Sequence, residues 1–396
     1  MHKCAGGRTC RLAIAGLRTS LVGLLLLQGA WAQQGSTAPQ IGPTGVIVHS
    51  QFGGQIFGFD IDQNGTEGVL AEAKTGSGAR VLAAVETFDQ TTGKILKVVT
   101  KTTTMDDFVT LGVVGTSVGL IEHEHVQGVL NVTRTFNTIN PLSSNKFTGA
   151  WTPPLKKNDL LSAVSRNQGV SGSAVLAFHN TVNQPRFVFG SDVGGNTFGP
   201  QVTLQDSTFT SSPQLAYDAI NNVAVVAASN GAVGGPAPKI ALVNLTSGQV
   251  TEFTGILGPP PFHQGFINGL AVDAEDQIAV TTTEVDFSVE FYDLTAQTGF
   301  RIVLPGATGQ LQSGSDVEYD PVNKLFFVAQ SVSSTASGSS IQVYDIHGNL
   351  VESLNGFNFS NAFNVIPTHI ALNPAKRTGY VDGPDAGVTQ LQGFTY

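Results

Sequence analysis

Residues 316–328 read DVEYDPVNKLFFV, in which a short apolar strand pattern ends in an aspartate and a polar turn leads to a second apolar strand pattern. The phrase recurs as QLAYDAINNVAVV at 214–226, GLAVDAEDQIAV at 269–280 and HIALNPAKRTGYV at 369–381. Its anchor residue therefore returns every 47 to 55 residues, as Asp218, Asp273, Asp320 and Asn373. A repeat of this period, built of strands with no helix between copies, is typical of a β-propeller.

A second repeated phrase predicts the turn between the two outer strands of a blade. It joins an alternating strand to an Asp or Asn and a tight polar turn. We expect the Asp or Asn to accept hydrogen bonds from the turn amides and the glycine that follows to take a positive φ. The residues concerned are Asp60, Asn244, Asp293 and Asp345, with Gly65, Gly248 and Gly348.

The number of copies predicts the number of blades. Weaker copies of the first phrase begin at Val81, Val118 and Leu160, which brings the inner-strand units to seven; eight blades is the alternative. We interpret the stretch from Gly45 as lacking an inner strand and the unit from His369 as lacking an outermost one. N- and C-terminal strands should then share a blade and close the ring. Because no window shows a sustained 3.6-residue apolar period, we expect an all-β domain without a helix longer than about two turns.

The N-terminal segment has the pattern of an export signal. Basic residues are followed by the apolar run LVGLLLL at 21–27 and by Ala-Trp-Ala at 30–32. We therefore expect a signal peptide at 1–32, a linker at 33–43 rich in Gln, Gly, Ser and Pro, and one propeller domain at 44–396. The predicted location is the periplasm or the outside of the cell.

Composition excludes several classes of function. Without residues 1–32 the chain has 16 basic and 29 acidic residues, so nucleic acid is not an expected partner. Both cysteines, Cys4 and Cys10, lie in the signal, which leaves no disulfide or thiolate ligand. No other stretch approaches the ~18 apolar residues that a membrane span needs. Charged residues make up only 12% of the chain, and its Gly, Pro and Ser clusters at 231–238, 258–261 and 331–340 are expected to be loops that protrude from a face.

The second half of the chain, from about Pro213, resembles the YVTN-type and lactonase-like propellers of exported bacterial proteins. The resemblance rests on DPVNKLFFVAQ from Asp320, the following SSIQVYDIHGNL, and NPAKRTGYV from Asn373. It implies the fold more than an activity, because that group includes sugar-lactone hydrolases, quinoprotein relatives and binding proteins without any reaction.

The candidate site lies where the predicted inner strands begin. Four residues before the anchors, or beside that position, the last four units carry the polar residues Gln214, Asn268, Asp316 and His369. These side chains could surround one mouth of the channel and bind a ligand, with Asp316 and His369 binding Ca²⁺ or a transition metal. Gluconolactonase-like propellers, which the chain resembles, hold a divalent cation in this region. The alternative is that the four side chains cap strand ends and form hydrogen bonds to neighbouring blades.

Two further motifs are weaker candidates. On a strand, residues 122–125 (Glu-His-Glu-His) would place His123 and His125 on one face, but two imidazoles do not make a metal site. Residues 115–119 match the nucleophile elbow G-x-S-x-G, which needs a helix after the serine, whereas a β pattern follows here.

Two functions from different classes remain. The first is a noncatalytic exported propeller that binds a small molecule, a glycan, a peptide or an envelope component through one face. The second is a metal-dependent hydrolase or lyase of the lactonase kind, acting at the mouth of the central channel.

Overall fold

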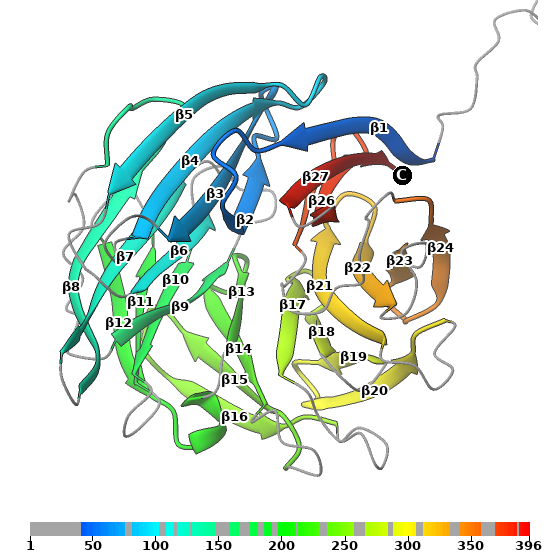
Figure 1. Cartoon of the computed structure of the whole chain (residues 1–396). Helices are drawn as coiled ribbons and strands as arrows, with labels where there is room; N and C mark the ends of the chain where they lie inside the picture. Colours follow the sequence, from blue (N-terminus) through cyan, green and yellow to red (C-terminus); the bar gives the residue numbers. More distant parts are fainter. Residues whose placement is uncertain are drawn as a thin grey trace, which may run out of the picture. The chain divides into compact units, whose positions relative to one another are not determined.

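The described residues form seven antiparallel sheets, six with four strands and one with three, in the computed structural model (Figure 1). They belong to one compact unit, Ile41–Tyr396. The predicted signal peptide and most of the linker lie outside the described residues. These are 41–75, 81–102, 108–114, 117–126, 129–147, 159–165, 175–180, 186–191, 197–210, 213–229, 236–256, 266–283, 288–305, 312–332, 340–357, 369–385 and 388–396.

The inner strands form a closed ring. The first strand of each sheet contacts the first strand of the next, and the last of them contacts the first. The inner strands are β2 (Gln55–Ile61), β6 (Phe108–Val114), β9 (Asp159–Ser165), β13 (Gln214–Asp218), β17 (Ile267–Asp273), β21 (Gln312–Asp320) and β25 (Ile370–Asn373). This arrangement confirms the predicted all-β ring.

The remaining strands follow outward in each sheet. The second strands are β3 (Glu67–Thr75), β7 (Ser117–Val126), β10 (Val175–Asn180), β14 (Val223–Ala228), β18 (Ile278–Thr283), β22 (Leu325–Val332) and β26 (Thr378–Asp385). The third strands are β4 (Val81–Asp89), β8 (Val129–Ile139), β11 (Arg186–Ser191), β15 (Lys239–Asn244), β19 (Ser288–Asp293), β23 (Ser340–Asp345) and β27 (Val388–Thr395). The outermost strands are β5 (Ile95–Thr102), β12 (Thr197–Thr203), β16 (Val250–Thr254), β20 (Thr298–Val303), β24 (Leu350–Leu354) and β1 (Gly42–His49).

Strands from the two ends of the described chain close the ring, as predicted. β1 is the outermost strand of the last sheet and pairs with β27 from Gly42↔Thr395 to His49↔Gln390 (Figure 1). It begins at Gly42, two residues before the predicted start of the domain. The first and last sheets are also joined by side chains: Lys376 Nζ donates to Gly65 O at 2.6 Å.

The predicted positions of the N-terminal strands within their sheets are wrong. Gln55–Ile61 was expected to precede an outer turn, but it is the inner strand β2 of a complete sheet. The copies from Val81 and Val118 begin in β4 and β7, which are a third and a second strand. Asp60 Oδ1 accepts the amide of its neighbour Ile61 at 2.8 Å, and the turn that follows is capped by Asp62, which accepts the amide of Asn64 at 2.9 Å. A strand alternates in the same way wherever it stands in a sheet, so periodicity alone could not assign its place.

The two ends of the strands form two different rims. Because consecutive strands are antiparallel, the turns after inner strands and after third strands lie on one rim, which we call the turn rim. The starts of the inner strands lie on the opposite rim, the connection rim. The Gly, Pro and Ser cluster at 258–261 and most of the clusters at 231–238 and 331–340 lie outside the described residues.

Short capped turns build the turn rim. Asp218 Oδ1 accepts the amides of Ile220 and Asn221, both at 3.0 Å, and Asp320 Oδ1 accepts two turn amides in the same way. The residue four positions after each anchor has a left-handed φ of 52° to 58°, namely Asn222, Gln277, Lys324 and Arg377. The first phrase therefore encodes a capped hairpin turn.

The turns after third strands confirm the second phrase in three of its four copies. The side chains of Asn244, Asp293 and Asp345 each accept two turn amides at 2.8–3.0 Å. Gly248 and Gly348 have φ values of 73° and 79°. The fourth expected copy fails because its strand is β2. In its place Asp89 accepts the amides of Thr91 and Thr92, and Gly93 has a φ of 72°.

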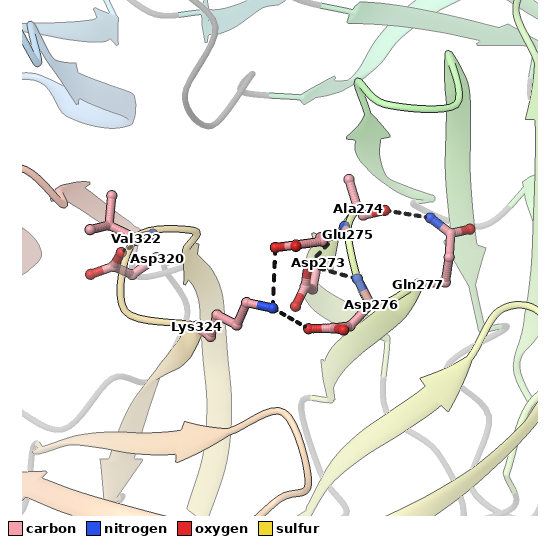
Figure 2. A network of polar contacts seen from close by, with 8 residues as sticks. All are labelled: Asp273, Ala274, Glu275, Asp276, Gln277, Asp320, Val322 and Lys324. Atoms are coloured by element: carbon pink, nitrogen blue, oxygen red, sulfur yellow. Dashed lines mark hydrogen bonds and ion pairs between the residues drawn. The ribbon is translucent and has the colours of Figure 1, made fainter.

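Neighbouring sheets are linked along the turn rim (Figure 2). Lys324, on the β21–β22 turn, binds Glu275 at 3.1 Å and Asp276 at 2.8 Å, both on the β17–β18 turn. These contacts raise the pKa of the lysine and lower that of Asp276. One sheet earlier in the ring, Gln277 Nε2 donates to Asp218 Oδ2 at 2.7 Å. The residue with left-handed φ in one turn thus contacts the preceding turn.

The core lies between the sheets. Phe291 on β19 packs edge-on against Phe326 on β22, with ring centroids 5.8 Å apart, and both side chains are buried. Within the described part of the chain the one helical segment is the short 3-10 turn η2 (Ser207–Thr210), and no helix there is long and apolar enough to cross a membrane.

Candidate functional site

The four predicted site residues lie on or directly before four consecutive inner strands, three of them at the strand starts on the connection rim and Asp316 as the fifth residue of the nine-residue β21. Gln214 begins β13, Asn268 is the second residue of β17, Asp316 lies in β21 and His369 directly precedes β25. All four are half-buried. The inner strands contact one another in the order β13, β17, β21, β25, so residues more than 150 positions apart in the sequence share one rim.

Gly269 sets the spacing between two of these strands. A Cβ atom at this position would lie 2.6 Å from Val317 N and 2.8 Å from Asp316 Cα. β17 and β21 therefore approach each other at a distance that only glycine permits. Register irregularities occur on both strands at this level, between Ile267 and Gly269 and between Gly314 and Asp316. Bulges of this kind change the direction of the side chains that follow them.

The Asp316 carboxylate joins two sheets. Its Oδ1 accepts the amide of Val317 at 2.9 Å, and its Oδ2 accepts the amide of Ile370, on β25, at 2.9 Å. The second bond brings Asp316 beside the residue that follows His369. The structure therefore places the two predicted metal ligands next to each other, and Asp316 also forms the hydrogen bond to a neighbouring sheet that the alternative interpretation predicts.

His369 is held by a buried carboxylate that the sequence analysis missed. Asp382, on β26, is 1% exposed; its Oδ1 accepts the His369 amide and its Oδ2 lies 3.0 Å from His369 Nδ1. In the neutral ring this contact places the proton on Nδ1 and the lone pair on Nε2. The His369 ring is nearly perpendicular to the Phe59 ring, at an interplanar angle of 84° and with centroids 6.5 Å apart. The one available sequence signal was a carboxylate inside the apolar strand pattern at 378–383.

The two weaker motifs lie in the three-stranded sheet. Residues 122–125 belong to β7, and the pairing of β7 with β8 has register irregularities after Glu122 and after Glu124. Ser117 begins the same strand, so a strand follows it where a nucleophile elbow needs a helix. The described part of the chain contains no group of three or more His, Cys, Asp or Glu side chains placed to hold a metal ion.

Comparison with known proteins identifies the fold. The sequence matches no family model, and no curated protein matches it. The structure is similar to that of U3-55K, with a TM-score of 0.58 at 11% identity over 89% of this chain and 99% of that one. The fold is that of a β-propeller.

Two other solved structures are similar, and one of them is a β-propeller domain. The β-propeller domain of Cps50 (Swd1) from Myceliophteria thermophila has a TM-score of 0.54 at 11% identity and covers 90% of this chain and 100% of that one. Hydrazine synthase from Kuenenia stuttgartiensis has a TM-score of 0.55 at 12% identity and covers 88% of this chain and 97% of that one. At these identities the similarity concerns the fold alone.

Proposed function

We propose that this chain is an exported β-propeller that binds a small molecule, a glycan, a peptide or an envelope component through the connection rim, without catalysis. One observation carries the proposal. Gln214, Asn268 and His369 are half-buried at the starts of inner strands on this rim, with Asp316 bonded to the residue after His369, whereas the described turns of the opposite rim are short and are capped by their own side chains. Binding residues concentrate on loops that a rigid scaffold positions.

Binding should depend on the connection rim and not on the turn rim. We expect Gln214→Ala with Asn268→Ala to weaken binding at least tenfold, because amide side chains orient polar ligands through paired hydrogen bonds. Lys324→Ala, on the turn rim, is the control and should leave binding unchanged. The measurement is affinity for hits from a glycan array and from immobilised envelope fragments. Equal losses in the two variants would contradict the assignment of the face.

A second candidate function is favoured by the contact between Asp382 and His369. A carboxylate that orients a histidine through Nδ1 is the usual support of a metal-binding imidazole, and Asp316 lies beside it. We therefore also propose a metal-dependent hydrolase or lyase of the lactonase kind, in which Asp316 and His369 hold a divalent cation. Ca²⁺ fits the carboxylate and a transition metal fits the imidazole.

Under this second candidate, calorimetric titration with Zn²⁺ or Ca²⁺ should show one bound ion per chain. Asp316→Asn with His369→Ala should abolish that binding and leave the protein folded, because the Asn carbonyl can still accept one backbone amide. Asp345→Asn with His347→Ala is a matched control, an Asp and a His on the turn rim. A purified wild-type protein that takes up neither ion would contradict the metal site and leave the noncatalytic proposal standing.

A further inference from the structure

Two buried glutamates lie side by side in the first sheet. Glu72 on β3 and Glu86 on β4 are both fully buried. Ala84 pairs with Glu72 and Leu70 pairs with Glu86, so the two glutamates are diagonal neighbours on one face of the sheet. Neither is part of the candidate site on the inner strands.

The segment Ser50–Gly54 covers both carboxyl groups. Glu72 Oε2 accepts Ser50 Oγ at 2.7 Å and the Gly54 amide at 2.8 Å. Glu86 accepts the amide of Phe52 on Oε1 at 2.8 Å and that of Gln51 on Oε2 at 3.2 Å. Four donors of one short segment therefore bind three of the four carboxyl oxygens.

The fourth oxygen indicates how the pair is protonated. Glu72 Oε1 is buried and has no hydrogen-bond partner among the described residues. Two adjacent carboxylates that are both ionised would repel each other at low dielectric, and a buried oxygen without a partner adds to the cost. A proton on Glu72, donated to Glu86, relieves both problems at once. The same arrangement of two carboxyls sharing one proton is known from aspartic-protease dyads.

The charged groups around the pair favour that proton. Burial raises the pKa of Glu72 to about 7, and the Glu86 charge acts in the same direction. The bonds from Ser50 and Gly54 and the charge of Lys74 oppose the rise. Burial also raises the pKa of Glu86. Lys74 is directed elsewhere, because its Nζ donates to Phe52 O and lies 3.9 Å from the centre of the Phe52 ring.

The covered segment, Ser50–Gly54, connects the last sheet of the ring to the first. It leads from β1, the outermost strand of the last sheet, to β2, the inner strand of the first sheet. We propose that Glu72 and Glu86 share one proton. This proton holds Ser50–Gly54 on the first sheet and makes the closed ring more stable in mild acid than above neutral pH. The ligand of this site is the proton itself.

The direction of the effect follows from proton linkage. Between a pKa near 4.5 in the unfolded chain and about 7 in the folded one, the folded protein holds a proton that the unfolded protein releases. Stability therefore falls as pH rises through this window and becomes level above it. From pH 5.5 to 8 the unfolding equilibrium constant should rise on the order of 20-fold from this pair.

The test is denaturant unfolding of the full chain at pH 5.5 and pH 8. Wild type should be more stable at pH 5.5. Glu72→Gln, whose amide can donate where the proton would lie, should lose most of the difference. Glu290→Gln is the control, a buried carboxyl in another sheet that is bonded by Thr281 Oγ1 and Ser288 Oγ, and it should keep the wild-type difference. A wild type with no fall in stability, or a Glu72→Gln variant that keeps the whole fall, overturns the proposal.

Amide exchange in wild type gives a second readout that needs no variant to fold. Protection factors of the Phe52 and Gly54 amides should drop between pH 5.5 and pH 8, whereas those of the capped turn at Ile220 and Asn221 should not. If protection at Phe52 and Gly54 is independent of pH, the proposal of a shared proton is wrong, even if Glu72→Gln fails to fold.

Discussion

Deleting residues 388–396 should prevent stable closure of the ring. This stretch forms β27, which pairs with both β26 and β1, and it carries the buried side chains Leu391, Phe394 and Tyr396. Each buried side chain of this size contributes about 1.5–3 kcal/mol, and β1 also loses its partner strand. The total approaches the whole stability of a typical domain, about 5–15 kcal/mol. We expect an insoluble protein or a melting temperature lowered by more than about 10 °C.

A point substitution separates packing from strand pairing. Phe394 packs against Phe327, Phe357 and Tyr396, so Phe394→Ala should cost about 3–5 kcal/mol while leaving the β1–β27 backbone pairing intact. Val303→Ala, an exposed apolar residue on the outermost strand β20, is the control and should change stability by less than about 0.5 kcal/mol. Thermal melts followed by circular dichroism measure both. An unchanged melt after the deletion would contradict the role of β27 in closure.

Gly269→Ala should have the next largest effect. The added Cβ would meet backbone atoms of Asp316 and Val317 at 2.6–2.9 Å, and a backbone atom cannot rotate away as a side chain can. β17 and β21 must then separate, which we expect to cost about 2–3 kcal/mol, in the range of overpacked cores. The shift should also disturb the Asp316–Ile370 bond. Urea unfolding measures the loss of stability.

The neighbouring residue provides the control for this prediction. Asn268→Ala removes a half-buried side chain but leaves the distance between the two strands unchanged, so it should cost clearly less than Gly269→Ala. A loss that is equal at the two positions would mean that the close approach of β17 and β21 does not limit stability. A loss confined to Asn268 would show that the side chain, and not the backbone spacing, holds this part of the rim.

Much of the second half of the fold could be predicted because its turns are local. Asp218 and Asp320 accept amides only two and three residues further on, so the phrase itself contains both partners of each bond. The first sheet has a different pattern. The turn after its inner strand β2 is capped by Asp62, one residue beyond the strand, and the capped turn at Asp89 follows a third strand. The sequence around Asp89 therefore does contain a capped-turn motif, but it is the second phrase, which follows a third strand, and not the first.

The candidate site could be predicted only in outline. Gln214, Asp316 and His369 occupy the same position in their repeats and Asn268 is one residue before it, and a ring of equal units brings such positions together. The partners of these residues could not be predicted. Asp316 binds a backbone amide 54 residues away, and Asp382 reaches His369 from the next strand. Bulges beside Gly269 and Asp316 also changed the register, and a periodic pattern does not include them.

By itself, the sequence determined the repeat, the all-β class, the capped turns and the closure of the ring by strands from its two ends, because these depend on contacts between near neighbours or on counting incomplete units. Only the tertiary structure decided which strand is innermost in the first sheet, how closely β17 and β21 approach, and which carboxyl groups are buried together. Glu72 and Glu86 are 14 residues apart on two strands, and the segment that covers them comes from an earlier part of the chain. Burial and the resulting pKa depend on all three pieces together, so no single stretch of sequence contains them.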